Sequence, residues 1–231
     1  MTTFQATRRF LMSFHLAHIE KGEGDYLILL HGNGEDSSYF ANQLEPLSKF
    51  FHVIAVDTRG HGRTPRGEGD FSLERFRDDL IGFMDEKGIK KAHLLGFSDG
   101  ANIALLLALS YPERVGKLIL NGGNIFPMGL KPKVLNQIIK EWNIAKKKNL
   151  LRQEELLRLM VMEPRLRWED LRRVEAECLV VVGSEDVIRA SHSKRMAAFL
   201  KRATFEEIEG GHDIAFSNSG AFNEKVLSFL L

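Results

Sequence analysis

The sequence predicts an α/β protein with a mostly parallel central sheet, an antiparallel N-terminal edge and helices on both faces. Short apolar runs alternate with longer amphipathic segments along the 231 residues, which is the pattern of βαβ units. Most of these runs are nearly continuous in Val, Ile and Leu, as expected for parallel strands buried on both faces. An apolar share of 44% and a charged share of 27% are those of a globular protein with a sizeable core.

The expected strands begin with the alternating segment SFHLAHIE, followed by a tight KGEGD turn and then YLILLHG. The first strand or two form the antiparallel edge. The later strands are FHVIAVD, AHLLGF, KLILNG, CLVVVG and TFEEIEG. Helices are expected at roughly 36–49, 72–87, 100–110, 190–201 and 220–231, and right-handed crossovers would connect the parallel strands.

Residues 124–175 interrupt this alternation. They contain no strand-like run, but amphipathic pieces such as KVLNQIIKEW and EELLRLMVM, punctuated by Pro127, Pro132 and Pro164. We therefore expect a small helical cap, inserted after the sixth strand, over one edge of the sheet. Residues 131–173 carry 12 Lys or Arg against 6 Asp or Glu. Solvated helix faces explain this excess, and attraction of an acidic substrate or carrier remains an alternative.

Charge and cysteine content restrict the partners and the compartment. The net charge of +1 lacks the large excess of basic residues that is typical of nucleic-acid-binding proteins. The one cysteine, Cys178, excludes an internal disulfide and lies in an apolar run, so we expect a buried residue in a reducing compartment. No stretch has the ~20 apolar residues of a membrane-spanning helix. The segment TRRFLM (7–12) is similar to a twin-arginine export signal, but polar residues soon follow it. We expect a cytoplasmic protein, and its oligomeric state stays open.

Four of the expected strands end in polar loops, and the carboxyl ends of parallel strands meet at one edge of a sheet. YLILL is followed by a loop that contains Asn33, and HLLGF by Ser98 within GFSDG. CLVVVG is followed by Asp186, and the last strand by His212. A serine, an acid and a histidine, in this chain order and with G-x-S-x-G at a strand-to-helix turn, resemble the α/β-hydrolase family.

This resemblance implies a role for each residue. Ser98 would be the nucleophile, and His212 the base that takes its proton and later returns it as an acid. Asp186 would orient the imidazole and stabilise its cation. The backbone N–H groups of Asn33 and Asp99 would form the oxyanion hole. Gly96 and Gly100, which flank Ser98, would leave space where strand and helix backbones crowd the strained serine.

Alternatives exist for two of these roles. Glu185 competes with Asp186 for the acid, and Asp186 is preferred from its place in the family pattern. The histidines that compete with His212 are His31, His61 and His192. Two of them precede the serine, against the expected order, and His192 lies in a segment rich in charged residues that favours a surface position.

The resemblance covers almost the whole chain, which we expect to be a single α/β-hydrolase domain (1–231) with residues 124–175 as its helical cap. It includes DTRGHGRT (57–64), similar to the D-x-R-G-x-G-x-S segment of esterase-like members, and SYPERVGKLIL (110–120). GFSDGANIAL followed by NGGNIFP is most similar to the valacyclovir hydrolase (biphenyl hydrolase-like) group. This implies a metal-free serine carboxylesterase, without a cofactor, that acts on a small ester or thioester through an acyl-enzyme.

Two departures leave the substrate open. The acid loop reads EDVIRA where relatives often carry a proline after the aspartate, and the cap is short for C–C bond hydrolases. Hydrolysis of a C–C bond or a lactone, perhydrolysis, and ligand binding without turnover remain alternatives. The side chain of Asp99 provides one substrate hypothesis, since the resemblance implies that it binds an ammonium group near the scissile ester. The alternative is that the carboxylate of Asp99 stabilises a helix N-terminus.

Overall fold

One seven-stranded sheet organises the protein in the computed structural model, which describes residues 14–231. The strands are β1 (His18–Lys21), β2 (Tyr26–Leu30), β3 (His52–Val56), β4 (Ala92–Phe97), β5 (Val115–Asn121), β6 (Glu177–Gly183) and β7 (Ala203–Ile208). Their spatial order is β1-β3-β2-β4-β5-β6-β7. Only β1 runs antiparallel, against β3, and all other neighbours are parallel. The predicted fold class is therefore confirmed.

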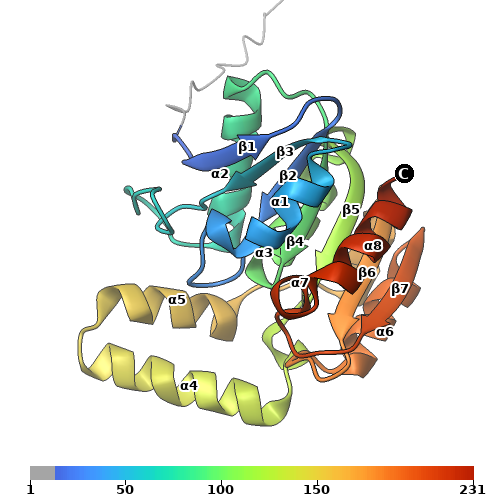
Figure 1. Cartoon of the computed structure of the whole chain (residues 1–231). Coiled ribbons are helices and arrows are strands. Elements are labelled where there is room, and N and C mark those ends of the chain that lie inside the picture. Colours follow the sequence, from blue (N-terminus) through green and yellow to red (C-terminus); the bar gives the residue numbers. More distant parts are fainter. Residues whose placement is uncertain (1–13) are drawn as a thin grey trace, which may run out of the picture.

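Helices cover both faces of this sheet (Figure 1). On one face lie α2 (Leu73–Glu86), α3 (Asp99–Ser110) and α6 (Ala190–Phe199), and on the other lie α1 (Ala41–Leu47), α7 (Ile214–Ser217) and α8 (Ser219–Leu230). The strands alternate between the two cores: Ile28 and Leu30 face the first helix group, whereas Leu27 and Leu29 face the second. Both faces of β2 are thus buried, as its continuous apolar run predicts.

The helical insertion between β5 and β6 contains α4 (Pro132–Lys147) and α5 (Leu151–Met162), followed by a 3-10 helix (Trp168–Arg173). The two α-helices lie outside the layers that cover the sheet (Figure 1). They share a small apolar cluster of their own, which includes Ile138 and Leu157. The expected position after a sixth strand is wrong, because the insertion follows the fifth strand of the described residues. Among the described residues, β1 alone precedes the KGEGD turn, and β2 to β5 lie between this turn and the insertion.

The structure bears on the predictions about membrane-spanning segments and about Cys178, but not on the prediction about the export-signal-like segment. Among residues 14–231, no helix is both long and apolar enough to cross a membrane. The segment TRRFLM (7–12) lies outside the described residues. Cys178 is 1% exposed and packs in the core beside α6, as expected.

Candidate active site

Ser98 occupies a strained turn between β4 and α3. Its backbone has φ 52° and ψ −117°, a left-handed conformation that a residue with a side chain rarely adopts. Its N–H donates to the carbonyl oxygen of Asn121 at 2.8 Å. A Cβ atom on Gly96 would lie 2.3 Å from the carbonyl oxygen of Gly100, and one on Gly100 would lie 1.9 Å from that of Leu30. The two glycines therefore provide the space that this turn requires, as predicted.

The structure brings the predicted serine, histidine and aspartate into one hydrogen-bonded chain. Nε2 of His212 lies 3.0 Å from Oγ of Ser98, and Nδ1 lies 2.7 Å from Oδ1 of Asp186. Asp186 is 3% exposed and also accepts a bond from the N–H of Ile188 at 2.8 Å. Because the carboxylate can only accept at Nδ1, the neutral imidazole presents Nε2 as an acceptor for the serine proton. Glu185, the competing acid, is exposed.

The competing histidines lie elsewhere. His31 and His61 are buried around Thr58, whose N–H donates to Nε2 of His31 at 3.0 Å. The hydroxyl of Thr58 lies 3.0 Å from Nδ1 of His61, and burial lowers the pKa of His61 to about 4. These two histidines connect the loops after β2 and β3, so their observed role is structural.

The prediction that His192 is a surface residue is wrong. It is 3% exposed, and its Nε2 accepts a hydrogen bond from the N–H of Ile125 at 3.2 Å. The rings of Phe126 and Trp168 pack against it at centroid distances of 4.9 and 5.0 Å, and burial lowers its pKa to about 4. Helix α6 buries this side against the segment after β5, a contact that local sequence does not reveal.

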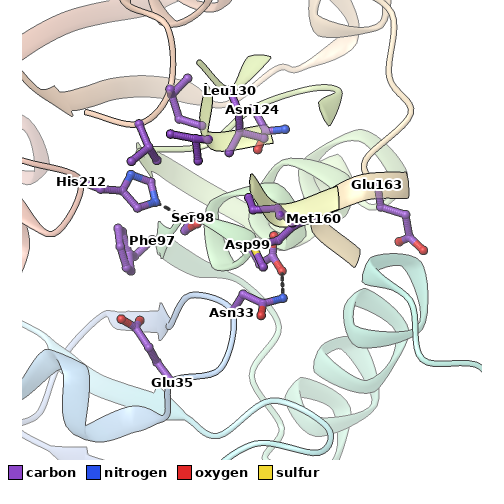
Figure 2. Close-up of a pocket in the computed structure, with 14 residues that line it drawn as sticks. Asn33, Glu35, Phe97, Ser98, Asp99, Asn124, Leu130, Met160, Glu163 and His212 are labelled. Atoms are coloured by element: carbon purple, nitrogen blue, oxygen red, sulfur yellow. Dashed lines mark hydrogen bonds between the residues drawn. The ribbon is translucent and has the colours of Figure 1, made fainter. Parts of the chain in front are cut away.

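The two residues predicted to form the oxyanion hole, Asn33 and Asp99, lie next to each other beside Ser98. Asp99 is the first residue of α3, so its N–H has no acceptor within the helix. Among residues 14–231, the N–H of Asn33 has no protein acceptor either. The side chain of Asn33 donates to Oδ2 of Asp99 at 2.8 Å (Figure 2). It also donates to the carbonyl oxygen of Leu156 at 3.0 Å. These bonds connect the loop after β2, the start of α3 and helix α5.

A pocket of about 240 Å³ opens above Ser98 and His212. Its apolar wall comes from the insertion and from the segment after β6: Leu130, Val134, Ile138, Met160, Val187 and Ile188. Three acidic residues also line it: Glu35, Asp99 and Glu163. Figure 2 shows that the carboxylate of Glu163 points away from Ser98. Within the described part of the chain, no lysine or arginine lines this pocket. The sequence analysis did not identify Glu35 or Glu163 as residues of the site.

Burial raises the pKa of all three carboxyl groups. Asp99 is 7% exposed, and its pKa rises to about 6. Desolvation also raises the pKa of Glu35 and of Glu163. Each is held by a backbone donor, since Glu35 accepts from the N–H of Gly32 at 3.1 Å and Glu163 from that of Leu73 at 2.8 Å. Residues 14–231 contain no group of three or more His, Cys, Asp or Glu arranged to hold a metal ion.

The chain belongs to the α/β-hydrolase fold family. The family's sequence profile, described as alpha/beta hydrolase fold, matches residues 25–154. The fold, the strained serine turn and the order of the three loops agree with this assignment.

Named relatives support hydrolase activity. The chain is 29% identical to a putative carbamate hydrolase, RutD, of Caulobacter segnis over 89% of this chain and 91% of that protein. It is 37% identical to the serine hydrolase BPHL of Homo sapiens over 48% of this chain and 40% of that protein. A solved structure of a meta-cleavage product hydrolase from Pseudomonas fluorescens (CumD) superimposes with a TM-score of 0.77, at 26% identity and 93% coverage of both chains. The protein is accordingly a hydrolase.

Proposed function

We propose that this hydrolase cleaves a small carboxylic ester or thioester through an acyl-enzyme formed on Ser98. The observation that carries the proposal is the hydrogen-bonded chain from Ser98 through His212 to Asp186. A serine hydroxyl is a weak nucleophile until a base removes its proton, and the Nε2 atom of His212 is within reach of that proton.

The reaction starts when Oγ of Ser98 attacks the carbonyl carbon and its proton passes to Nε2 of His212. The carbonyl oxygen becomes an oxyanion, which the N–H groups of Asn33 and Asp99 stabilise, and Asp186 stabilises the imidazolium. The C–O bond to the leaving group then breaks, and His212 gives its proton to the departing oxygen.

Deacylation repeats these steps with water. His212 takes a proton from the water molecule as its oxygen attacks the acyl carbon, and then returns the proton to Oγ of Ser98. The carboxylic acid leaves and the free enzyme is restored. In this proposal residues 1–231 form one domain, and residues 124–175 form the cap that supplies the apolar wall of the pocket.

The pocket favours a small substrate with an ammonium group near the scissile bond. A volume of about 240 Å³ lies below the usual range for drug-sized ligands, which begins at about 300 Å³. Asp99 is pocket-lining and nearly buried, and it forms no ion pair with another described residue. Its raised pKa of about 6 leaves it mostly ionised at pH 7. An ammonium group of the substrate would neutralise this charge.

Carbamate hydrolysis is a second candidate, favoured by the likeness to the putative carbamate hydrolase over 89% of this chain. A carbamate carbonyl would meet the same nucleophile, base and oxyanion hole. The two candidates therefore differ in substrate and not in machinery.

A fluorophosphonate probe and a substrate panel test the proposal. We expect the probe to label the wild type and not Ser98→Ala, and short-chain p-nitrophenyl esters to be hydrolysed only by the wild type. Matched amino-acid esters, their uncharged analogues and carbamates then rank the substrate classes. An enzyme that resists the probe and hydrolyses none of these compounds would refute the proposed reaction. Equal rates for charged and uncharged esters, unaffected by Asp99→Asn, would refute the ammonium hypothesis alone.

A further inference from the structure

We propose that Glu35 makes the enzyme selective for substrates whose leaving group carries a positive charge. This inference rests on the proposed acyl-enzyme reaction and concerns the side of the pocket opposite to Asp99. It assigns a substrate-recognition role to a residue that the catalytic chain does not require.

Glu35 lies beside the proposed base. It follows β2 in the loop that also carries Asn33, and its carboxylate lines the pocket together with Phe97 and His212. A Cβ atom on Gly32 would lie 3.0 Å from Oε2 of Glu35 and 3.0 Å from two ring atoms of Phe97. The carboxylate and the ring are therefore neighbours. The Phe97 ring in turn contacts the His212 ring at a centroid distance of 4.8 Å.

The proposed mechanism places the leaving group on this side of Ser98. His212 must give its proton to the departing oxygen, so that oxygen has to lie close to Nε2 of His212. The carbonyl oxygen points instead toward the N–H groups of Asn33 and Asp99. Figure 2 shows Glu35 on the same side of Ser98 as His212 and Phe97, whereas Asp99 and Glu163 lie on the other side. Glu35 is thus the pocket carboxylate available to the leaving group.

The charge of Glu35 has no basic partner. Among residues 14–231 it forms no ion pair, and its hydrogen bond comes from the backbone N–H of Gly32. The charged groups near enough to shift the pKa of Glu35 are His212, Asp36 and Asp213, and two of these are acids. The side chain is half-buried beside an apolar ring, and a charge pair is stronger where water is partly excluded. A cationic leaving group would provide the missing partner.

The hydrogen bond to Gly32 could instead make Glu35 a purely structural residue that orders its loop. Glu35→Gln separates the two roles. Its amide oxygen can still accept from the N–H of Gly32, whereas the negative charge is lost. A structural role alone predicts that this substitution affects charged and neutral substrates equally.

The experiment compares the acetate ester of choline with 3,3-dimethylbutyl acetate, an uncharged ester of almost the same shape. We expect the wild type to prefer the choline ester in kcat/KM by about tenfold, the scale of one partly buried charge pair. Glu35→Gln should reduce this ratio to near one. Because each ratio is taken within one enzyme, a general loss of activity cancels. Glu185→Gln is the matched control, since Glu185 is exposed and does not line the pocket, and it should keep the wild-type ratio.

The outcomes separate this inference from the proposed reaction. Hydrolysis of both esters with a ratio near one, or with a ratio that Glu35→Gln leaves unchanged, overturns the role of Glu35 while the acyl-enzyme reaction stands. If neither ester is hydrolysed and Ser98 resists a fluorophosphonate probe, both proposals fail together. A ratio that falls equally in Glu35→Gln and Glu185→Gln also overturns the inference, because long-range charge would then explain it.

Discussion

Replacing Asp99 by Asn should make the protein more stable at neutral and alkaline pH. The carboxylate is 7% exposed, and no described lysine or arginine pairs with it. Asparagine has nearly the same shape, and its amide oxygen can still accept the hydrogen bond that Asn33 donates to Asp99 at 2.8 Å. The substitution therefore removes a buried charge without opening a cavity, and it keeps an acceptor for the Asn33 amide.

The raised pKa fixes the size and the pH dependence of this effect. The pKa of Asp99 rises from its ordinary value of 3.8 to about 6, chiefly because burial disfavours the charged form. The folded state then binds the proton more tightly than the unfolded state, so stability is lost as pH rises from 3.8 through 6. Each unit of pKa shift corresponds to about 1.36 kcal/mol of unfolding free energy. The loss of stability therefore reaches about 3 kcal/mol at pH values above 6, and it is about 1 kcal/mol at pH 4.5.

Urea denaturation of wild type and Asp99→Asn at pH 8 and pH 4.5, followed by the fluorescence of Trp142 and Trp168, measures this difference. We expect the variant to be more stable by about 3 kcal/mol at pH 8, and the advantage to shrink to about 1 kcal/mol at pH 4.5. Glu185→Gln, which removes an exposed carboxylate, should change little at either pH. An advantage of equal size at both pH values, or a less stable variant at pH 8, would refute the reasoning.

Three further substitutions test other parts of the structure. Gly100→Ala should cost about 3 kcal/mol of unfolding free energy and most of the activity, because its Cβ would lie 1.9 Å from the last carbonyl oxygen of β2; urea titration of the variant measures the loss, and wild-type stability would contradict it. Asp79→Ala should cost about 3–5 kcal/mol in the same assay, because it leaves the 1%-exposed guanidinium of Arg59 without its bidentate partner. Asp186→Asn should lower kcat for ester hydrolysis by about 10³–10⁴-fold at unchanged fold, because an amide can donate to Nδ1 of His212 and favour the wrong tautomer; a loss of less than tenfold would argue against the role of Asp186.

The proximity of Ser98, Asp186 and His212 could be predicted because their positions follow from general rules of parallel sheets. Ser98 comes directly after β4, and Asp186 and His212 lie in the loops that follow β6 and β7. The carboxyl ends of parallel strands meet at one edge of the sheet. Chain order then distinguishes His212 from the two earlier histidines. The roles of Gly96 and Gly100 also follow locally, since a strained turn between a strand and a helix requires small neighbours.

The contribution of Glu163 to the acidic lining of the pocket could not be predicted in the same way, because it depends on packing between distant segments. Glu163 follows the last residue of α5 and lines the pocket. Its carboxylate accepts a bond from the N–H of Leu73, at the start of α2. Nothing in the local sequence indicates that partner. The burial of His192 depends on distant segments in a similar way. Its helix is rich in charged residues, which predicts a surface position, but this side chain packs against Phe126 and Trp168. Glu35 is different, because it lies in the loop after β2, two residues after Asn33, so its nearness to the site follows from local sequence.

The distribution of charge explains how a nearly neutral protein can have a selective pocket. The net charge is +1, yet residues 131–173 contain 12 basic and 6 acidic residues, while the pocket beneath them is lined by carboxylates and by no lysine or arginine of the described chain. At physiological ionic strength charges in solvent are screened over about 8 Å, whereas buried charges are screened much less. The basic surface of the insertion therefore has little influence on a cation that has already entered. In the proposed function, discrimination would arise at contact distance, from Asp99 on one side of Ser98 and from Glu35 on the other. Substitutions in the pocket should then alter selectivity far more than substitutions on the outer face of the insertion.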